Sequence, residues 1–158
     1  MIECDVKIGK ADLYDYNLKY TYGKFINILA EIIGFAAVVW GIYSANYPLA
    51  VLGAIVVIYL PVTLLMRSAQ VAALSPAFKN PLHYRLDDEG LTVSQGESEE
   101  TIKWENCIKA VSTSRSILVF TSRTGATIFP RNQLGDKIPL VIQCISRNMA
   151  PDKVNIKC

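Results

Sequence analysis

The chain has 158 residues, of which 51% are apolar, and its mean hydropathy is +0.27. Its net charge of +2 is too small for the basic footprint of a nucleic-acid-binding protein, so we expect no nucleic-acid partner. The four cysteines are scattered and form no CxxC pair, which favours free thiols in a reducing cytoplasm over a disulfide framework.

Residues 1–23 are expected to form a strand followed by an amphipathic helix. Residues 2–8 alternate between apolar and polar side chains, which predicts a short strand. Residues 11–22 carry apolar side chains at helical spacing, and the tyrosines among them suit either a membrane interface or packing against a soluble domain. Acidic residues and the lack of a basic start argue against a cleaved secretory signal.

Residues 24–67 are predicted to form a transmembrane helical hairpin. The two arms read FINILAEIIGFAAVVWGIYSA and PLAVLGAIVVIYLPVTLLM, joined through Asn46 and Tyr47. Each arm provides the roughly 20 helical residues that cross a bilayer core. Pro61 lies inside the second arm and predicts a kink.

Small residues recur along one face of the first arm, where a second helix could approach closely. They are Ala30, Gly34, Ala37, Gly41 and Ala45, and the second arm carries the small residues Ala50 and Gly53.

Basic residues lie on both sides of the hairpin, and its central connection carries no charge. Lys7, Lys10, Lys19 and Lys24 precede the hairpin, and Arg67 and Lys79 follow it. The positive-inside rule therefore places both termini in the cytoplasm.

Residues 68–80 are predicted to extend the second helix as far as Ser75 and then to form a linker. Residues 81–158 read as six short strands separated by turn signals, followed by a helix over residues 135–149. This pattern predicts an α+β protein whose cytoplasmic part is a meandering antiparallel sheet or small barrel closed by a C-terminal helix, as in pleckstrin-homology (PH)-like domains. We expect residues 81–158 to fold alone, with the strand at residues 2–8 as the segment that could complete the sheet. The expected core is Trp104, Val111, Leu118, Phe120, Ile128, Val141 and Ile145.

Several stretches resemble the YcxB-like family of small bacterial membrane proteins. They are HYRLDDEGLTVSQGE, IKWENCIKAVSTSRSILVF and IFPRNQLG, together with the earlier ADLYDYNL and PAFKNPLHY. The resemblance implies a membrane hairpin with a YcxB-like C-terminal domain, and it implies no catalytic residue. Cys107 departs from the larger apolar residue expected there, which concerns local packing.

Glu31 is the most unusual residue, because an acid inside a membrane helix is costly. A structural role is favoured over a proton or ion relay, since one hairpin offers no second acid. Arg67 and Thr63 on the second arm are the candidate intramembrane contacts, and Tyr59 is another candidate partner. An inter-subunit contact is the remaining alternative.

Arg115 and Arg131 are predicted to lie at one end of the sheet, with Arg123 at the other. Two arginines at one edge suit a lipid headgroup or an acidic partner, although solvated turn residues are the simpler interpretation. His83 is the single histidine and has no paired cysteine, so a zinc site is not expected. No nucleophile motif or phosphate-binding loop occurs, so we assign no catalytic, cofactor or metal residue.

We therefore expect a non-enzymatic interaction or regulatory module, anchored by two helices in the bacterial cell membrane with both termini cytoplasmic. Its partners would be the lipid bilayer and a protein or lipid headgroup. The alternative is an accessory subunit of a membrane transporter or channel, in which Glu31 and the small-residue face contact other helices.

Overall fold

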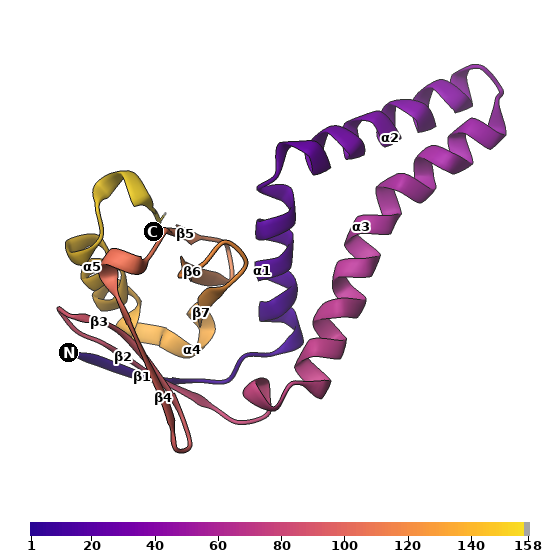
Figure 1. Ribbon diagram of the computed structural model, residues 1–158. Helices are drawn as coiled ribbons and strands as arrows, with labels where there is room; N and C mark the ends of the chain where they lie inside the picture. The colour runs from indigo at the N-terminus through magenta and orange to yellow at the C-terminus, as the bar shows by residue number, and fades with distance from the viewer. Residues whose placement is uncertain (157–158) are drawn as a thin grey trace.

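The computed structural model describes residues 1–156 and shows an α+β protein with two parts (Figure 1). The hairpin consists of α2 and α3. The head consists of β1, α1 and the elements that follow α3. The helices and strands are β1 (Ile2–Val6), α1 (Lys10–Tyr22), α2 (Phe25–Tyr43), α3 (Tyr47–Leu74), β2 (Leu82–Leu86), β3 (Gly90–Gln95), β4 (Ser98–Lys103), β5 (Lys109–Ser112), β6 (Ser116–Phe120), β7 (Ala126–Pro130), α4 (Arg131–Leu134), α5 (Ile138–Asn148) and β8 (Val154–Asn155).

The hairpin projects away from the head, and both of its helices are long and apolar enough to cross a membrane. Asn46 caps α3 by accepting a hydrogen bond from the Leu49 amide at 3.4 Å, so Tyr47 belongs to the helix. The connection is therefore residues 44–46, rather than the Asn46–Tyr47 pair predicted from the sequence. Pro48 occupies the first turn of α3, where its missing N–H costs nothing.

The glycines among the predicted small residues form the contact between α2 and α3, whereas Ala45 lies exposed in the connection. A Cβ atom at Gly41 would lie 2.5 Å from the backbone nitrogen of Ala50. A Cβ at Gly53 would lie 2.5 Å from the carbonyl oxygen of Gly34. Only glycine permits such close backbone approach, so these positions determine how tightly the two helices pack.

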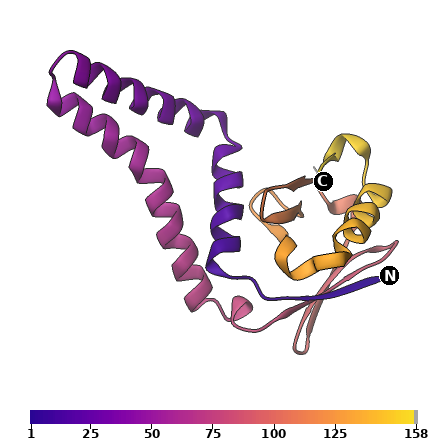
Figure 2. The same ribbon diagram turned by 180° about the vertical axis from the view of Figure 1, so that it is seen from behind.

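Helix α3 continues to Leu74, as the sequence predicts, and thus extends well beyond the apolar arm. It remains helical through Pro61 and changes direction along its length (Figure 1). Its second half packs against α1, where Asn17 donates a 2.9 Å hydrogen bond to the hydroxyl of the buried Ser68. Helix α1 thus stands between α3 and the sheets, as Figure 2 shows from behind.

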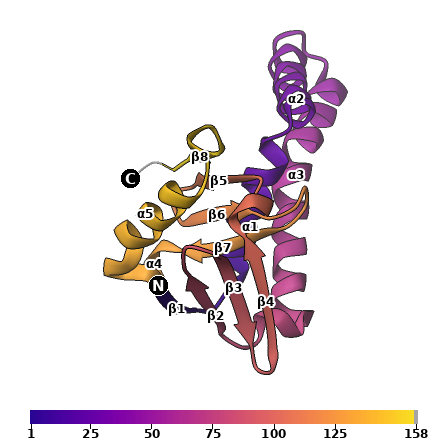
Figure 3. The same cartoon turned by 60° about the vertical axis from the view of Figure 1, so that its left-hand side comes forward.

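The head contains two four-stranded sheets, instead of the single meander or barrel that the sequence suggested. The first has the order β1-β2-β3-β4 and is antiparallel throughout. The second has the order β7-β6-β5-β8, and its β8 pairs in parallel with β5 (Figure 3). The 3₁₀ turn at Trp104–Asn106 separates β4 from β5 and takes the chain from one sheet to the other.

The N-terminal segment is part of the head. Strand β1 pairs with β2, and it contributes the buried Val6 to the common core. Helix α1 covers one face of the second sheet, where the rings of Tyr16 and Phe120 lie 5.9 Å apart. On the other face, Phe129 approaches Tyr84 of the first sheet at 4.9 Å between ring centroids. Strand β6 is therefore buried on both faces, which explains its uninterrupted apolar run.

Helix α5 packs its apolar face on the sheets, with Val141 and Ile145 fully buried. Six of the seven predicted core residues are buried, and Val111 is half-buried against the same core. The helix is not the last element, because β8 follows it and completes the second sheet.

Candidate functional site

The junction of α1 and α2 gives Glu31 a hydrogen-bond partner. The Tyr22 hydroxyl donates to Glu31 Oε1 at 2.9 Å. Nearby, Asn27 Nδ2 donates to the Thr21 carbonyl at 2.8 Å and ties the first turn of α2 to the last turn of α1. The chain changes direction here, where α1 ends at Tyr22 and α2 begins at Phe25 after two intervening residues (Figure 1).

Burial and the bonded carboxylate of Glu31 together raise the pKa of Tyr22 to about 12. Loss of hydration is the larger cause, and the hydrogen bond and the charge of Glu31 act in the same direction. Tyr22 therefore stays protonated at neutral pH and acts as a hydrogen-bond donor. The Glu31 carboxylate thus has a local hydrogen-bond donor.

The pairing of Glu31 with Arg67 considered from the sequence is not formed within the described residues. Gly41 faces Ala50 and Gly34 faces Val56, so each step along α2 toward Lys24 matches a step along α3 toward Arg67. Arg67 lies past this contact, beside α1, because the hydroxyl of the adjacent Ser68 accepts a hydrogen bond from Asn17 in the middle of α1.

Thr63 also has no contact with Glu31 among the described residues. Its hydroxyl donates to the carbonyls of its own helix, at 2.7 Å to Tyr59 and 3.0 Å to Leu60. The structure therefore brings Thr63 and Arg67 to one hollow, and the hydrogen-bond partner of Glu31 is Tyr22 instead. The Tyr22 partner was missed because it lies on a separate helix, where no periodicity links it to Glu31.

Arg115 and Arg131 are brought together at one end of the second sheet. The Arg131 amide donates to the Arg115 carbonyl at 2.8 Å, and Arg123 lies in the turn at the opposite end of β6. The Arg115 side chain is exposed and that of Arg131 is half-buried. The backbones of the two arginines are thus held together at one end of this sheet.

Thr113 fixes the turn that carries Arg115. Its hydroxyl accepts hydrogen bonds from the amides of Arg115 at 3.2 Å and Ser116 at 2.9 Å. The same hydroxyl donates to Asp15 of α1 at 2.5 Å. Helix α1 therefore orients the turn, a role that the sequence did not reveal.

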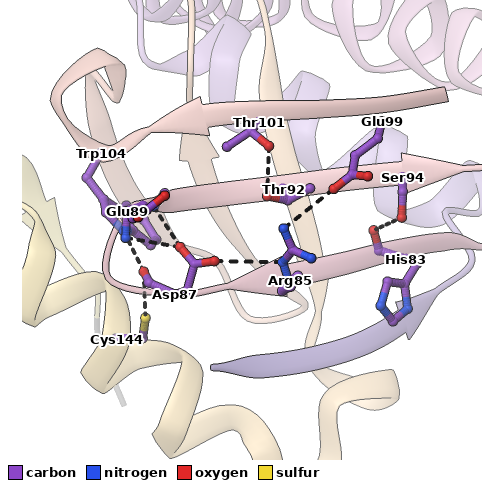
Figure 4. Close-up of polar contacts among 11 residues, drawn as sticks. His83, Arg85, Asp87, Glu89, Thr92, Ser94, Glu99, Thr101, Trp104 and Cys144 are labelled. Carbon is purple, nitrogen blue, oxygen red and sulfur yellow. Dashed lines mark hydrogen bonds and ion pairs between the residues drawn. The ribbon is translucent and has the colours of Figure 1, made fainter.

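Asp87 organises the turn between β2 and β3 (Figure 4). Its carboxylate accepts hydrogen bonds from the amides of Glu89 and Gly90, both at 3.0 Å. Its carbonyl accepts a bond from the Trp104 indole at 2.8 Å, and the thiol of Cys144 lies 3.9 Å away. These contacts connect the first sheet to the 3₁₀ turn and to α5, so the Asp87 turn has a structural role.

Gly90 is required in that turn for steric reasons. A Cβ atom there would lie 2.4 Å from the carbonyl oxygen of Ile102 on β4. The DDEG motif therefore combines a carboxylate that closes the turn with a glycine that admits the next strand.

His83 pairs across the strands with Asp5, at 2.7 Å between Nδ1 and Oδ1. Both side chains are substantially exposed on the outer face of the first sheet. Across residues 1–156, no three potential metal-ligating side chains gather into one group.

Cys4, Cys107 and Cys144 are free thiols, and Cys158 lies outside the described residues. Burial raises the pKa of all three thiols, which keeps them protonated and poorly nucleophilic at neutral pH. Cys107 is buried in the core, so the smaller side chain at this position is accommodated by the packing of the head.

Comparison with known proteins places the central part of the head in a family. No curated protein and no solved structure matches the chain. Residues 86–145 match the family model described as YcxB-like protein. The match runs from the end of β2 into α5 and contains the Asp87 turn, Trp104, Arg115 and Arg131. Over these residues, the chain is similar to YcxB-like proteins.

Proposed function

We propose that this chain is a membrane-anchored interaction or regulatory module without enzymatic activity, whose hairpin spans the bacterial cell membrane and whose head lies in the cytoplasm. The observation that carries the proposal is the exposure of the hairpin. Large apolar side chains such as Ile32, Phe35 and Ile55 are more than half exposed, and they surround both helices.

Water is a poor solvent for such a surface. Soluble monomers rarely expose contiguous apolar patches larger than a few hundred Å². Helix α2 has 19 residues, or roughly 28 Å of helix, which suits the ~30 Å hydrocarbon core of a bilayer. A bilayer would cover this surface on all sides.

The charge pattern supports a cytoplasmic head. Lys24 precedes the first apolar arm and Arg67 follows the second, and residues 44–46 at the far end are uncharged. The positive-inside rule places the basic end in the cytoplasm, together with both termini.

We further propose that the head is PH-like and uses the Arg115–Arg131 end to bind an acidic group of a protein partner or lipid headgroup. Two sheets packed with one amphipathic helix support the comparison with PH-like domains. The two arginines come from separate elements that a backbone hydrogen bond holds together, which supports their acting at one site.

An accessory subunit of a transporter or channel is the second candidate. The exposed faces of α2 and α3 could pack against other membrane helices instead of lipid. However, the small residues that would favour such packing are occupied within the hairpin. Crosslinking in native membranes distinguishes the two, since a stoichiometric partner with many membrane helices would favour the subunit.

Cysteine labelling tests the topology. Buried native thiols are unreactive on either side, so Cys144 and Cys158 are first replaced by serine and single cysteines are introduced at exposed positions. An impermeant maleimide should label Asn46→Cys in intact cells, and Ser98→Cys at the tip of the β3–β4 hairpin only after permeabilisation. Labelling of Ser98→Cys in intact cells would overturn the assignment, and recovery of the chain in the soluble fraction would overturn membrane anchoring.

A further inference from the structure

Two adjoining hollows run along α3, one polar and one apolar. The first, of about 500 Å³, lies at the base of the hairpin and is lined by Arg67, Gln70 and Thr21 among others. The second, of about 360 Å³, continues toward the hairpin tip between apolar side chains such as Ile55 and Ile58. Tyr59 and Thr63 line both hollows and join them into one groove.

Arg67 is the only charged residue, among those that the structure describes, that lines either hollow. Its side chain is exposed, and within residues 1–156 it has neither an ion pair nor a hydrogen bond. Gln70 and Thr21 add neutral polar groups beside it. The polar end of the groove therefore presents an uncompensated positive charge surrounded by hydrogen-bonding side chains.

The length of the groove matches one leaflet of a bilayer. From Arg67 to Ile55 the helix rises through 12 residues, or roughly 18 Å. Half of a ~30 Å hydrocarbon core is about 15 Å. A molecule with an anionic head beside Arg67 and an apolar chain along Ile58 and Ile55 would fill both hollows.

We propose that this groove binds one anionic phospholipid, with its phosphate at Arg67 and an acyl chain along α3. The inference rests on the proposed membrane anchoring, and it assigns to Arg67 a ligand outside the protein. The free phosphate group alone would engage only the polar hollow, whereas the lipid engages both. The site lies on the hairpin and is separate from the Arg115–Arg131 end of the head.

Native mass spectrometry of the full chain in mild detergent tests this assignment with phosphatidylglycerol and phosphatidylcholine of identical acyl chains. The wild type should bind phosphatidylglycerol about fivefold more tightly, the ratio expected from one basic side chain near an anionic lipid. Arg67→Gln should lose this preference and Arg67→Lys should keep most of it. Arg147→Gln, which removes an exposed cation from α5, should behave as the wild type.

Two further measurements separate the lipid from its headgroup. Ala54→Trp fills the apolar hollow and should weaken both lipids alike. Glycerol phosphate should not displace phosphatidylglycerol at matched concentration. Equal preference in Arg67→Gln and the wild type, or full displacement by glycerol phosphate, would overturn the lipid site.

Membrane fractionation of the same variants keeps this outcome distinct from the proposed function. A chain that stays in the membrane and binds both lipids equally would overturn the lipid site and leave the anchor standing. A chain that washes off membranes would overturn the anchor.

Discussion

The hairpin and the head hold their apolar side chains in opposite ways. In the hairpin, glycines form the contact between α2 and α3, and the large side chains point outward. In the head, the large side chains point inward, and β6 has every residue buried. Apolar residues therefore do not by themselves indicate a protein core, because in the hairpin the small residues make the contact and the large ones form the surface.

The head is also not continuous in sequence. Helix α1 comes before the hairpin, yet it packs on β6 through Tyr16 and on α3 through Asn17. The head is thus assembled from both ends of the chain, with the hairpin inserted between them. This arrangement gives the hairpin two covalent attachments to the head.

The largest expected effect comes from removing the N-terminal segment. A fragment starting at Pro81 lacks β1 and α1, so it loses the buried Val6, Ile8 and Leu13. Each buried aliphatic side chain contributes about 1.5–3 kcal/mol, which sums to a large share of the ~5–15 kcal/mol that stabilises a domain. We therefore expect no cooperative melt from this fragment, in contrast to the independent folding predicted from the sequence.

The matched control for that fragment keeps residues 1–23 and replaces residues 24–80 with a flexible Gly/Ser linker that can run the length of α1, roughly 20 Å. This chain should be soluble and unfold cooperatively in urea. Equal melts from the two proteins would show that the N-terminal segment is dispensable.

A smaller effect is expected from crowding the hairpin. Gly53→Ala places a Cβ against the Gly34 carbonyl and the Val38 amide, so the helices must separate. Overpacking of this kind costs about 1–3 kcal/mol. Unfolding of the hairpin in detergent should shift by that amount while the melt of the head stays unchanged. Ala36→Leu, on an exposed position of α2, serves as the control and should leave both transitions in place.

The smallest effect concerns the bond between Tyr22 and Glu31. Tyr22→Phe should cost about 0.6 kcal/mol, the average for hydrogen bonds in membrane proteins, and Glu31→Gln should cost less because the amide oxygen still accepts. A double-mutant cycle should show coupling between Tyr22 and Glu31. The cycle of Glu31 with Arg67 should be additive, and strong coupling there would contradict the observed partner.

The stabilisation that the Tyr22–Glu31 hydrogen bond provides should decrease at high pH. The pKa of Tyr22 rises from its ordinary 10 to about 12 in the folded chain. The contribution of the bond is therefore complete below pH 10 and is lost as the pH rises through 12. Tyrosinate absorbance of the wild type and Tyr22→Phe measures this transition.

Much of the fold follows from patterns within single segments. The end of α3 at Leu74, before Ser75-Pro76, and the six short strands after residue 81 were all anticipated within a few residues. The contact through Gly34, Gly41 and Gly53 was anticipated as well, because small residues at helical spacing mark a face that a neighbouring helix can approach. Local periodicity carries this information directly.

Which strands pair within each sheet was harder to predict from the sequence. Strand β1 joins β2 across the whole hairpin, and β8 reaches β5 after α5. Pairing between such distant segments depends on which surfaces remain uncovered once the nearer elements have packed. The short β8 carries too few residues for any alternation to show.

By itself the sequence determined the apolar hairpin, the succession of strands and the amphipathic α5, since each depends on the spacing of side chains along one segment. Only the tertiary structure decided that residues 1–22 complete the head, that Tyr22 rather than Arg67 bonds Glu31, and that Arg67 lines the polar end of a groove. Each of these outcomes depends on the angle and register between helices, which packing sets across the whole molecule.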